Sequence, residues 1–304
     1  MDTGASVIAR LKNKAKETGK PFQLHLQLFC QEEFLRRLAA SCYAENLVLK
    51  GGLFIYTLTN FESRATVNID FLLQQFPGRI EDIKRMVDEI ISVDSGNDFI
   101  TFTSRGFETI SPQRKYTGVS FQLVGQIKNT RTPFDVDFDV GDIIIPMPRK
   151  RAIPVQLDGF GAPEVLTYSL ESTIAEKFDA LLQRLELTSR MKDIYDIYYL
   201  SSIFDFDGWA LRQAIFEALQ NRGTAYERGS FNRVIALAGN KDIQVRWRQY
   251  MRRLKMTELP LEEVMVCIDR FLRPAWDAIL SEEELFMQWD CKTATWHGEK
   301  KAVL

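Results

Sequence analysis

The stretch from Leu49 to Leu73, LKGGLFIYTLTNFESRATVNIDFLL, constrains the fold of this chain more than any other. It indicates a short apolar strand, a Lys-Gly-Gly turn, a short helix, a charged loop and a second strand that brings in Asp70. A glycine pair after a strand permits a tight turn and leaves backbone N–H groups available to phosphate. Asn68 and Asp70 share a face of the second strand, because strand side chains repeat every second residue. The stretch therefore predicts a phosphate-binding turn beside a carboxylate that can hold Mg²⁺.

Composition excludes several classes of protein. The chain has 304 residues, enough for two packed units, and its formal charge of −2 provides no overall attraction for nucleic acid. Only two histidines occur, which argues against a His-rich zinc site and a Ser-His-Asp hydrolase. One of them, His25, stands between Leu24 and Leu26, and we expect it to pack in the core. The four cysteines form no CxxC pair, so reduced thiols are expected.

The N-terminal segment does not look like a signal peptide. Residues 1–20 carry charges where such a peptide needs an apolar centre, and no run of eighteen apolar residues occurs in the chain. We therefore expect a cytoplasmic protein with no membrane partner.

Hydrophobic spacing predicts an α/β region followed by a helical one. Strands are expected at 47–49, 67–73, 98–104, 106–111, 117–128 and 134–140. Helices are expected at 4–18, 22–42, 79–93, 169–186, 189–201, 207–221, 241–257 and 260–280. The segment 141–168 is rich in Pro and Gly, which indicates a connection between two units.

Residues 134–140, FDVDFDV, alternate strictly between apolar and acidic side chains. Asp135, Asp137 and Asp139 share one face of the expected strand and lie about 6–7 Å from their neighbours, so they repel one another unless water or a cation relieves the charge. A solvated edge strand and a cation site both fit this pattern. The second acidic strand, at Asp70, favours the cation site.

Several separated motifs, in order, resemble one family. They are LKGG, R-x-T-x-x-x-D, VDFDVGD, YSLESTIAEKFDAL and SRMKDIYDIY, and the likeness runs from about residue 5 to residue 201. The chain resembles the AbiEii-type nucleotidyltransferase toxins, the toxin half of type IV toxin–antitoxin and abortive-infection systems. The resemblance implies a polymerase-β-like core with a mixed β-sheet flanked by helices, over residues 1–160, followed by a helical C-terminal domain, over 161–304.

The resemblance also implies an activity and partners. It implies transfer of a nucleotide from an NTP to an acceptor, which in some members is the 3′ end of tRNA, with Mg²⁺ and with a cognate antitoxin. Lys50, Gly51 and Gly52 match the motif whose backbone holds the NTP phosphates. Arg64 and Thr66 are further candidates for nucleotide contact.

The family's acidic and basic positions also have counterparts here. Asp70 and Asp137 match two of its metal-binding acids. Lys177 matches a lysine that could offset charge on departing pyrophosphate, and Asp193 matches a later acid that could orient Lys177 or deprotonate the acceptor. Lys177 and Asp193 can meet only if two helices pack side by side, so the resemblance implies that the C-terminal domain contributes both to the site.

One residue departs from the family pattern. Asn68 stands where the first acid of the paired motif is expected; an amide oxygen can bind Mg²⁺ but adds no charge. This leaves open a full two-metal site, a one-metal enzyme, and a catalytically weak nucleotide-binding or interaction protein. Nucleotidylation of a protein hydroxyl uses the same site and is a third alternative.

A basic segment at 246–255, RWRQYMRRLK, is the best candidate for contact with RNA. On a helix, Arg248, Arg252 and Lys255 share one face. Trp247 and Tyr250 lie nearby and could stack on a base. A solvated helix face is the other interpretation of this pattern.

Overall fold

The computed structural model describes residues 3–110, 118–187, 190–256 and 259–298. The chain forms two compact units, which we describe separately. Unit 1 comprises Met1–Asp142 and Pro148–Tyr168, and unit 2 comprises Ile143–Met147 and Ser169–Leu304. The boundary expected at residue 160 falls within unit 1. Among the described residues, no helix is both long and apolar enough to cross a membrane.

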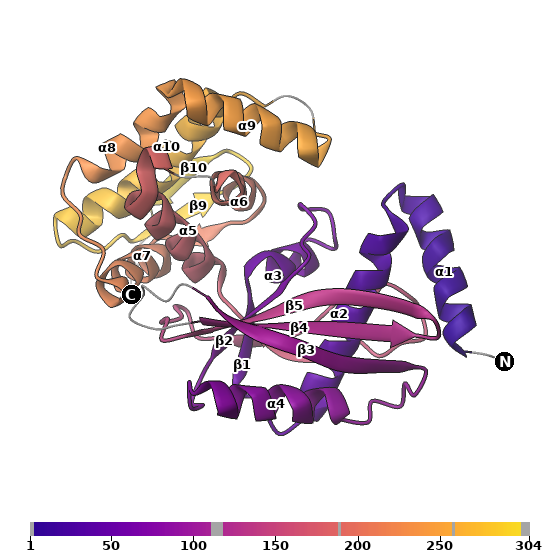
Figure 1. Cartoon of the computed structure of the whole chain (residues 1–304). Helices are drawn as coiled ribbons and strands as arrows, with labels where there is room; N and C mark the ends of the chain where they lie inside the picture. Colours follow the sequence, from indigo (N-terminus) through magenta and orange to yellow (C-terminus); the bar gives the residue numbers. More distant parts are fainter. Residues whose placement is uncertain (1–2, 111–117, 188–189, 257–258, 299–304) are drawn as a thin grey trace, which may run out of the picture. The chain divides into compact units, whose positions relative to one another are not determined.

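Unit 1 is a mixed seven-stranded sheet with helices packed against it, as expected (Figure 1). The strand order is β3-β4-β5-β2-β1-β7-β6. Its helices are α1 (Thr3–Thr18), α2 (Phe22–Ala40), α3 (Gly51–Leu58) and α4 (Ile80–Ser92). Its strands are β1 (Leu47–Lys50), β2 (Ile69–Leu73), β3 (Ile100–Ile110), β4 (Gly118–Ile127), β5 (Thr130–Val140), β6 (Arg149–Ala152) and β7 (Glu164–Thr167).

The β5 strand confirms the alternation seen in the sequence. Phe134, Val136 and Phe138 are buried on the side covered by α2, which also packs against α4, while the aspartates occupy the other face. The strand is not at an edge of the sheet: β4 lies antiparallel on one side and β2 parallel on the other. The solvated-edge interpretation of this strand is therefore wrong.

The segment 141–168 is not simply a connection, contrary to the prediction from its Pro and Gly content. It contains β6 and β7, and β7 pairs in parallel with β1 while β6 pairs antiparallel with β7. Both strands have only four residues, so their partners in the sheet define them more than their own sequence does. Expected strands 98–104 and 106–111 form one strand, β3, with a bulge at Ser104/Gly106; residue 111 and the start of expected strand 117–128 lie outside the described residues.

Unit 2 is mainly helical, as expected. It contains α5 (Leu170–Arg184), α6 (Met191–Ile203), α7 (Gly208–Arg222), α8 (Ser230–Ile235), α9 (Lys241–Leu254) and α10 (Leu261–Leu280), with 3₁₀ turns at Leu185–Leu187 and Ala236–Gly239. The sequence did not reveal its small antiparallel sheet of β8 (Phe206–Asp207), β9 (Met287–Asp290) and β10 (Thr295–Gly298). Trp276 lies at the core of this unit, with Phe178, Tyr226 and Phe231 against its ring.

Polar residues of α2 are buried in unit 1 and anchor its loops. His25 is a core residue, as predicted, and its ring nitrogens lie 2.8 Å from Thr18 Oγ1 and 2.7 Å from Gln156 Oε1. Glu32 accepts a hydrogen bond from the Gln156 backbone N–H and pairs with Arg36. Burial raises the pKa of Glu32 to about 8, although these two partners and Lys14 act in the opposite direction.

We expect Glu32 to make unfolding depend on pH. Because its folded pKa lies above its ordinary value of 4.5, it contributes most stability below that value and loses the contribution as pH rises toward 8. Glu32→Gln should remove that slope, by up to about 1.4 kcal/mol per pH unit, in urea unfolding between pH 5 and 8. Glu45→Gln, at a surface carboxylate, is the control. Parallel curves for wild type and Glu32→Gln would contradict the assignment.

Candidate active site

The candidate site of unit 1 is a row of polar side chains across four neighbouring strands. Lys50 of β1 is the register partner of Asp70 on β2, Asp70 is the partner of Asp137 on β5, and Asp137 is the partner of Ser120 on β4. Register partners in adjacent strands project to the same face, about 5 Å apart. The fold thus places two carboxylates from distant parts of the sequence side by side.

Asp137 is held by two hydrogen-bond donors. Ser120 Oγ donates to Asp137 Oδ1 at 2.5 Å, and Asn68 Nδ2 donates to Asp137 Oδ2 at 3.2 Å. Partial burial raises the pKa of Asp137, and the neighbouring charges of Asp70 and Asp135 act in the same direction, whereas the two donors lower it. The sequence did not single out Ser120, although it lies directly opposite Asp137 in the sheet.

The glycine pair begins a helix and makes no separate turn: Lys50 ends β1 and Gly51 opens α3. Gly51 has a φ of +67°, and a Cβ there would lie 2.2 Å from Asp70 Oδ2. A Cβ on Gly52 would lie 2.7 Å from Thr66 Oγ1 and 3.5 Å from an Arg64 guanidinium nitrogen. Both glycines are therefore required by close approach of the α3 backbone to side chains of the predicted site.

The side chain of Lys50 contacts two acids that follow Asp137 in the sequence. It is buried, and its Nζ lies 3.1 Å from Asp139 Oδ2 and 3.2 Å from Asp142 Oδ2. Lys50 thus neutralises two acids next to Asp137. Nucleotide binding by the backbone at Lys50, Gly51 and Gly52 stays a prediction; the first N–H groups of α3 lack intrahelical partners and are available to phosphate.

The loop that carries Arg64, Thr66 and Asn68 is fixed from two sides. Gln27 and Gln31 of α2 both donate to the Val67 carbonyl oxygen, Gln31 at 2.9 Å. At its other end, Lys20 Nζ donates to the Phe61 carbonyl oxygen at 2.7 Å. These anchors explain how an irregular segment can present side chains beside Gly52 and Asp137.

Unit 2 brings Lys177 and Asp193 together, because α5 packs against α6. Lys177 Nζ lies 3.2 Å from Asp193 Oδ1 and 2.7 Å from Asp196 Oδ2, a residue that the sequence did not single out. Asp193 is fully buried, and Arg190 Nε lies 2.5 Å from its other oxygen. Asp193 is thus in a position to orient Lys177, and its role as a general base stays a prediction.

The basic segment keeps only part of its predicted surface. Arg248 and Arg252 are exposed on α9, but Lys255 lies beyond the helix, in a left-handed C-cap conformation with a φ of 55°. Trp247 is 1% exposed, and its Nε1 donates to the Leu259 carbonyl oxygen at 2.7 Å. The prediction that Trp247 could stack on a base is therefore wrong, because its ring belongs to the core.

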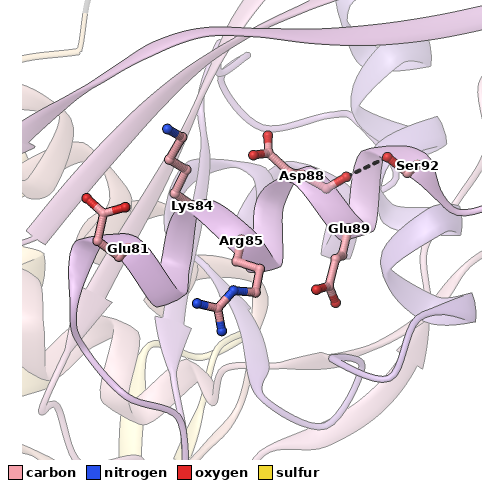
Figure 2. Close-up of a pocket in the computed structure, with 6 residues that line it drawn as sticks. All are labelled: Glu81, Lys84, Arg85, Asp88, Glu89 and Ser92. Carbon is pink, nitrogen blue, oxygen red and sulfur yellow. Dashed lines mark hydrogen bonds between the residues drawn. The ribbon is translucent and has the colours of Figure 1, made fainter.

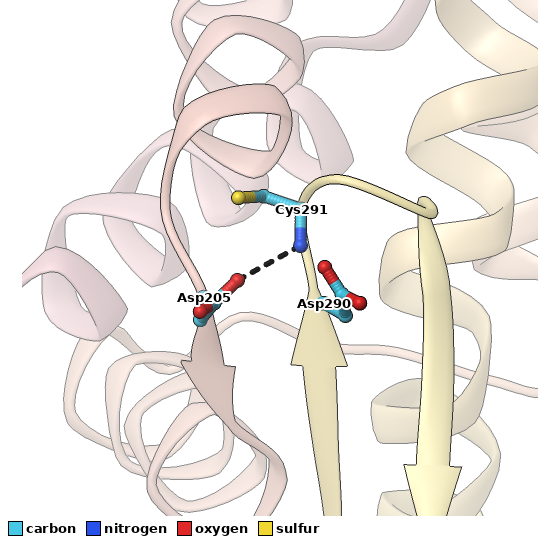
Figure 3. A group of neighbouring side chains, drawn as sticks. All are labelled: Asp205, Asp290 and Cys291. Carbon is cyan, nitrogen blue, oxygen red and sulfur yellow. Dashed lines mark hydrogen bonds between the residues drawn. The ribbon is translucent and has the colours of Figure 1, made fainter.

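Two other groups of polar residues lie apart from the predicted site residues, one on α4 and one at the end of β8 and β9. Figure 2 shows six residues around a shallow hollow, all on α4, where acidic and basic side chains are mixed on a solvated face. Figure 3 shows Asp205, Asp290 and Cys291 at the β8–β9 end. The Cys291 N–H donates to Asp205 Oδ1 at 2.9 Å. Burial is the main cause that raises the pKa of the Cys291 thiol, and the neighbouring Asp205 carboxylate is the second. The raised pKa disfavours the thiolate, which is the form that binds metals.

Comparison with known proteins decides the family. Residues 33–282 match the family described as nucleotidyl transferase AbiEii toxin, type IV TA system. The chain belongs to this family. Membership in the AbiEii toxins, nucleotidyltransferases of type IV toxin–antitoxin systems, implies an NTP as substrate and an antitoxin as partner. The family recognised from the separated sequence motifs is confirmed, as is the fold class.

Two solved structures are also similar. A candidate nucleotidyltransferase from H. pylori has a TM-score of 0.44 at 13% sequence identity, with 86% of this chain and 99% of that chain covered. JHP933 from Helicobacter pylori has a TM-score of 0.46 at 12% identity, with 86% and 94% covered. No match was found among curated proteins.

Proposed function

We propose that this AbiEii toxin transfers a nucleotide from an NTP to RNA, with the 3′ end of tRNA as acceptor, in a Mg²⁺-dependent reaction in the cytoplasm. The observation that carries the proposal is the cross-strand pairing of Asp70 and Asp137 beside the Gly51 backbone. Two carboxylates and an adjacent helix N-terminus supply the metal ligands and the anion site that nucleotide transfer needs.

The side chains around Asp137 suit Mg²⁺, a hard cation that prefers oxygen ligands. Asp70 and Asp137 would hold it, with Asn68 Oδ1 as a neutral third ligand. When bound, the ion offsets charge on the phosphate oxygens that surround the reacting phosphorus. In the structure Asn68 already acts on the site, because its amide holds Asp137 in place by donating to Oδ2.

The remaining residues bind and orient the nucleotide. The N–H groups of Gly51 and Gly52 would receive phosphate oxygens at the start of α3, and Arg64 and Thr66, which lie closest to Gly52, would add donors from the side. Lys177 would offset charge on the departing pyrophosphate. On α9, Arg248 and Arg252 are exposed and are our candidates for contact with RNA phosphates.

Transfer assays test the proposal. Purified protein is incubated with Mg²⁺ and each α-labelled NTP, in parallel with tRNA, tRNA lacking its 3′ terminal nucleotides, other RNA, and total protein. We expect label in tRNA with wild type and none with Asp70→Ala. Label in protein alone would replace the acceptor with a protein hydroxyl. Nucleotide binding without transfer to any acceptor would establish the weak nucleotide-binding protein instead, an alternative that Asn68 favours.

Replacement of Asn68 tests how the site uses its amide. Asn68→Asp exchanges a donor to Asp137 for a like charge, and the added charge also repels NTP phosphates. We expect a several-fold rise in KM with little change in kcat, when both are measured over a range of Mg²⁺ concentrations. This corresponds to a loss of about 1 kcal/mol of binding free energy that the ground state and the transition state share. Asn68→Ala removes the donor without the charge and serves as control. An inactive wild type with an active Asn68→Asp variant would identify the chain as a degenerate family member.

A further inference from the structure

Lys177 belongs to a cluster of charged side chains enclosed within unit 2. The cluster contains two cations, Lys177 and Arg190, and two anions, Asp193 and Asp196. Only 11% of the Lys177 side chain is exposed, and the two carboxylates are 0% and 1% exposed. Carboxylates buried this deeply are stable only when cations pair with them, and Arg190, 32% exposed, connects the cluster to solvent. The two carboxylates are nevertheless not equivalent partners of the lysine.

Asp193 divides its charge between two cations. Its Oδ1 faces Lys177 Nζ at 3.2 Å, while its Oδ2 faces Arg190 Nε at 2.5 Å. The shorter contact is to Arg190, which lies three positions earlier and reaches Asp193 across the first turn of α6. The Arg190 contact is an ion pair without a hydrogen bond, whereas Lys177 donates a hydrogen bond to Oδ1, so Asp193 is shared between its own helix and α5.

Asp196 makes the shorter contact to the lysine, with Oδ2 at 2.7 Å from Nζ. It lies three positions after Asp193, so both acids project from the same side of α6 toward Lys177 on α5. Two opposite charges at this distance, largely shielded from water, attract each other strongly. Loss of Asp196 would remove the shorter of these two contacts of Lys177, and the longer one is to a carboxylate that Arg190 also contacts.

We propose that Asp196 is the positioning residue of Lys177, the side chain that fixes its ammonium group in place and keeps it charged for contact with NTP phosphate. The part that concerns phosphate rests on the proposed function. The part that concerns the ammonium group is independent of it, because it concerns only contacts within unit 2. By this assignment, Asp193 contacts both Arg190 and Lys177 and contributes less than Asp196 to the position of Lys177.

Chemical labelling of lysine tests the assignment without using activity. Only the uncharged amine reacts with an acylating ester, and loss of a carboxylate at 2.7 Å makes an ammonium group easier to deprotonate. We expect Asp196→Asn to label Lys177 about tenfold faster than wild type at pH 8, by peptide mass spectrometry, and faster than Asp193→Asn does. Exposed Lys84 on α4 should label equally in all proteins and reports reagent activity. Circular dichroism confirms that each variant is folded.

The kinetic readout is the KM for NTP, which Asp196→Asn should raise by a larger factor than it lowers kcat, with recovery in Asp196→Glu. Equal labelling of Lys177 in wild type and Asp196→Asn, or a larger increase in Asp193→Asn, overturns the assignment. If Asp196→Asn will not fold, Asp196→Glu takes its place, and an unchanged labelling rate of Lys177 in that variant supports the carboxylate contact. The assignment is overturned if Lys177 in Asp196→Glu labels as fast as it does in a short control peptide that contains Lys177 and is acetylated only at its N-terminus. A wild type that transfers nothing refutes the proposed function alone, because labelling still decides the role of Asp196.

Discussion

Replacing Asp137 with Asn is expected to lower the rate of nucleotide transfer by about a thousandfold or more. This factor corresponds to the several kcal/mol of transition-state stabilisation that a bound cation contributes. Asp137 is the cross-strand partner of Asp70, and both carboxylates project to one face of the sheet. The amide keeps the size of the side chain, its oxygen can still accept from Ser120, and its NH2 can donate to Asn68 Oδ1 after the Asn68 amide flips, so the fold should survive. Initial rates at saturating NTP, together with Mn²⁺ binding by calorimetry, measure the two losses separately.

The neighbouring aspartates of β5 supply matched controls. Asp135 lies opposite Gln122, away from Asp70, and Asp139 is paired with Lys50. Asp135→Asn and Asp139→Asn remove the same charge from the same strand, so we expect smaller losses from them. Equal losses in all three variants would mean that β5 provides a general acidic surface and that Asp137 is not a specific ligand.

The parts of the fold that the sequence predicted are those with strong local periodicity. Strict alternation in FDVDFDV predicted β5, and helical spacing predicted α4 and α10 within a few residues. The strands β6 to β10 escaped because each has four residues or fewer and is defined by its pairing with other strands, whereas the equally short β1 was marked by the glycine pair that follows it. Composition alone mistook the first two for a linker.

The candidate site shows the same division. Asp70, Asp137, Lys177 and Asp193 were predicted from motifs, and the structure places them in two pairs, Asp70 beside Asp137 and Lys177 beside Asp193. Ser120 and Asp196 were missed because serine and aspartate are common at strand and helix positions, and only tertiary packing shows what they contact. A usable signal for Asp196 was its spacing of three from Asp193, which places both on one helix face.

Replacing Gly51 with Ala is expected to reduce transfer by about a hundredfold, the cost of displacing a reactive group by about 1 Å. The new Cβ would lie 2.2 Å from Asp70 Oδ2, 2.6 Å from its Cγ and 2.9 Å from its Cβ, so the carboxylate must move. Movement of Asp70 should also weaken Mn²⁺ binding in calorimetry. Gly51→Ala would thus lower activity by displacing the Asp70 carboxylate, although no ionisable residue has been replaced.

Backbone strain must be separated from this displacement, because Ala at the φ of +67° of Gly51 costs about 1–2 kcal/mol by itself. Gly96 provides the control: its φ is +74°, and a Cβ there would meet nothing within 4 Å. Both variants should lose the stability that backbone strain costs, and Gly51→Ala should lose more in urea unfolding because of its clash with Asp70, but Gly96→Ala should keep wild-type transfer and Mn²⁺ affinity. If Gly51→Ala retained both as well, the approach of the α3 backbone to Asp70 would have no role in the reaction. Loss in Gly51→Ala alone would tie the glycine to the position of one carboxylate, since strain is common to the two variants.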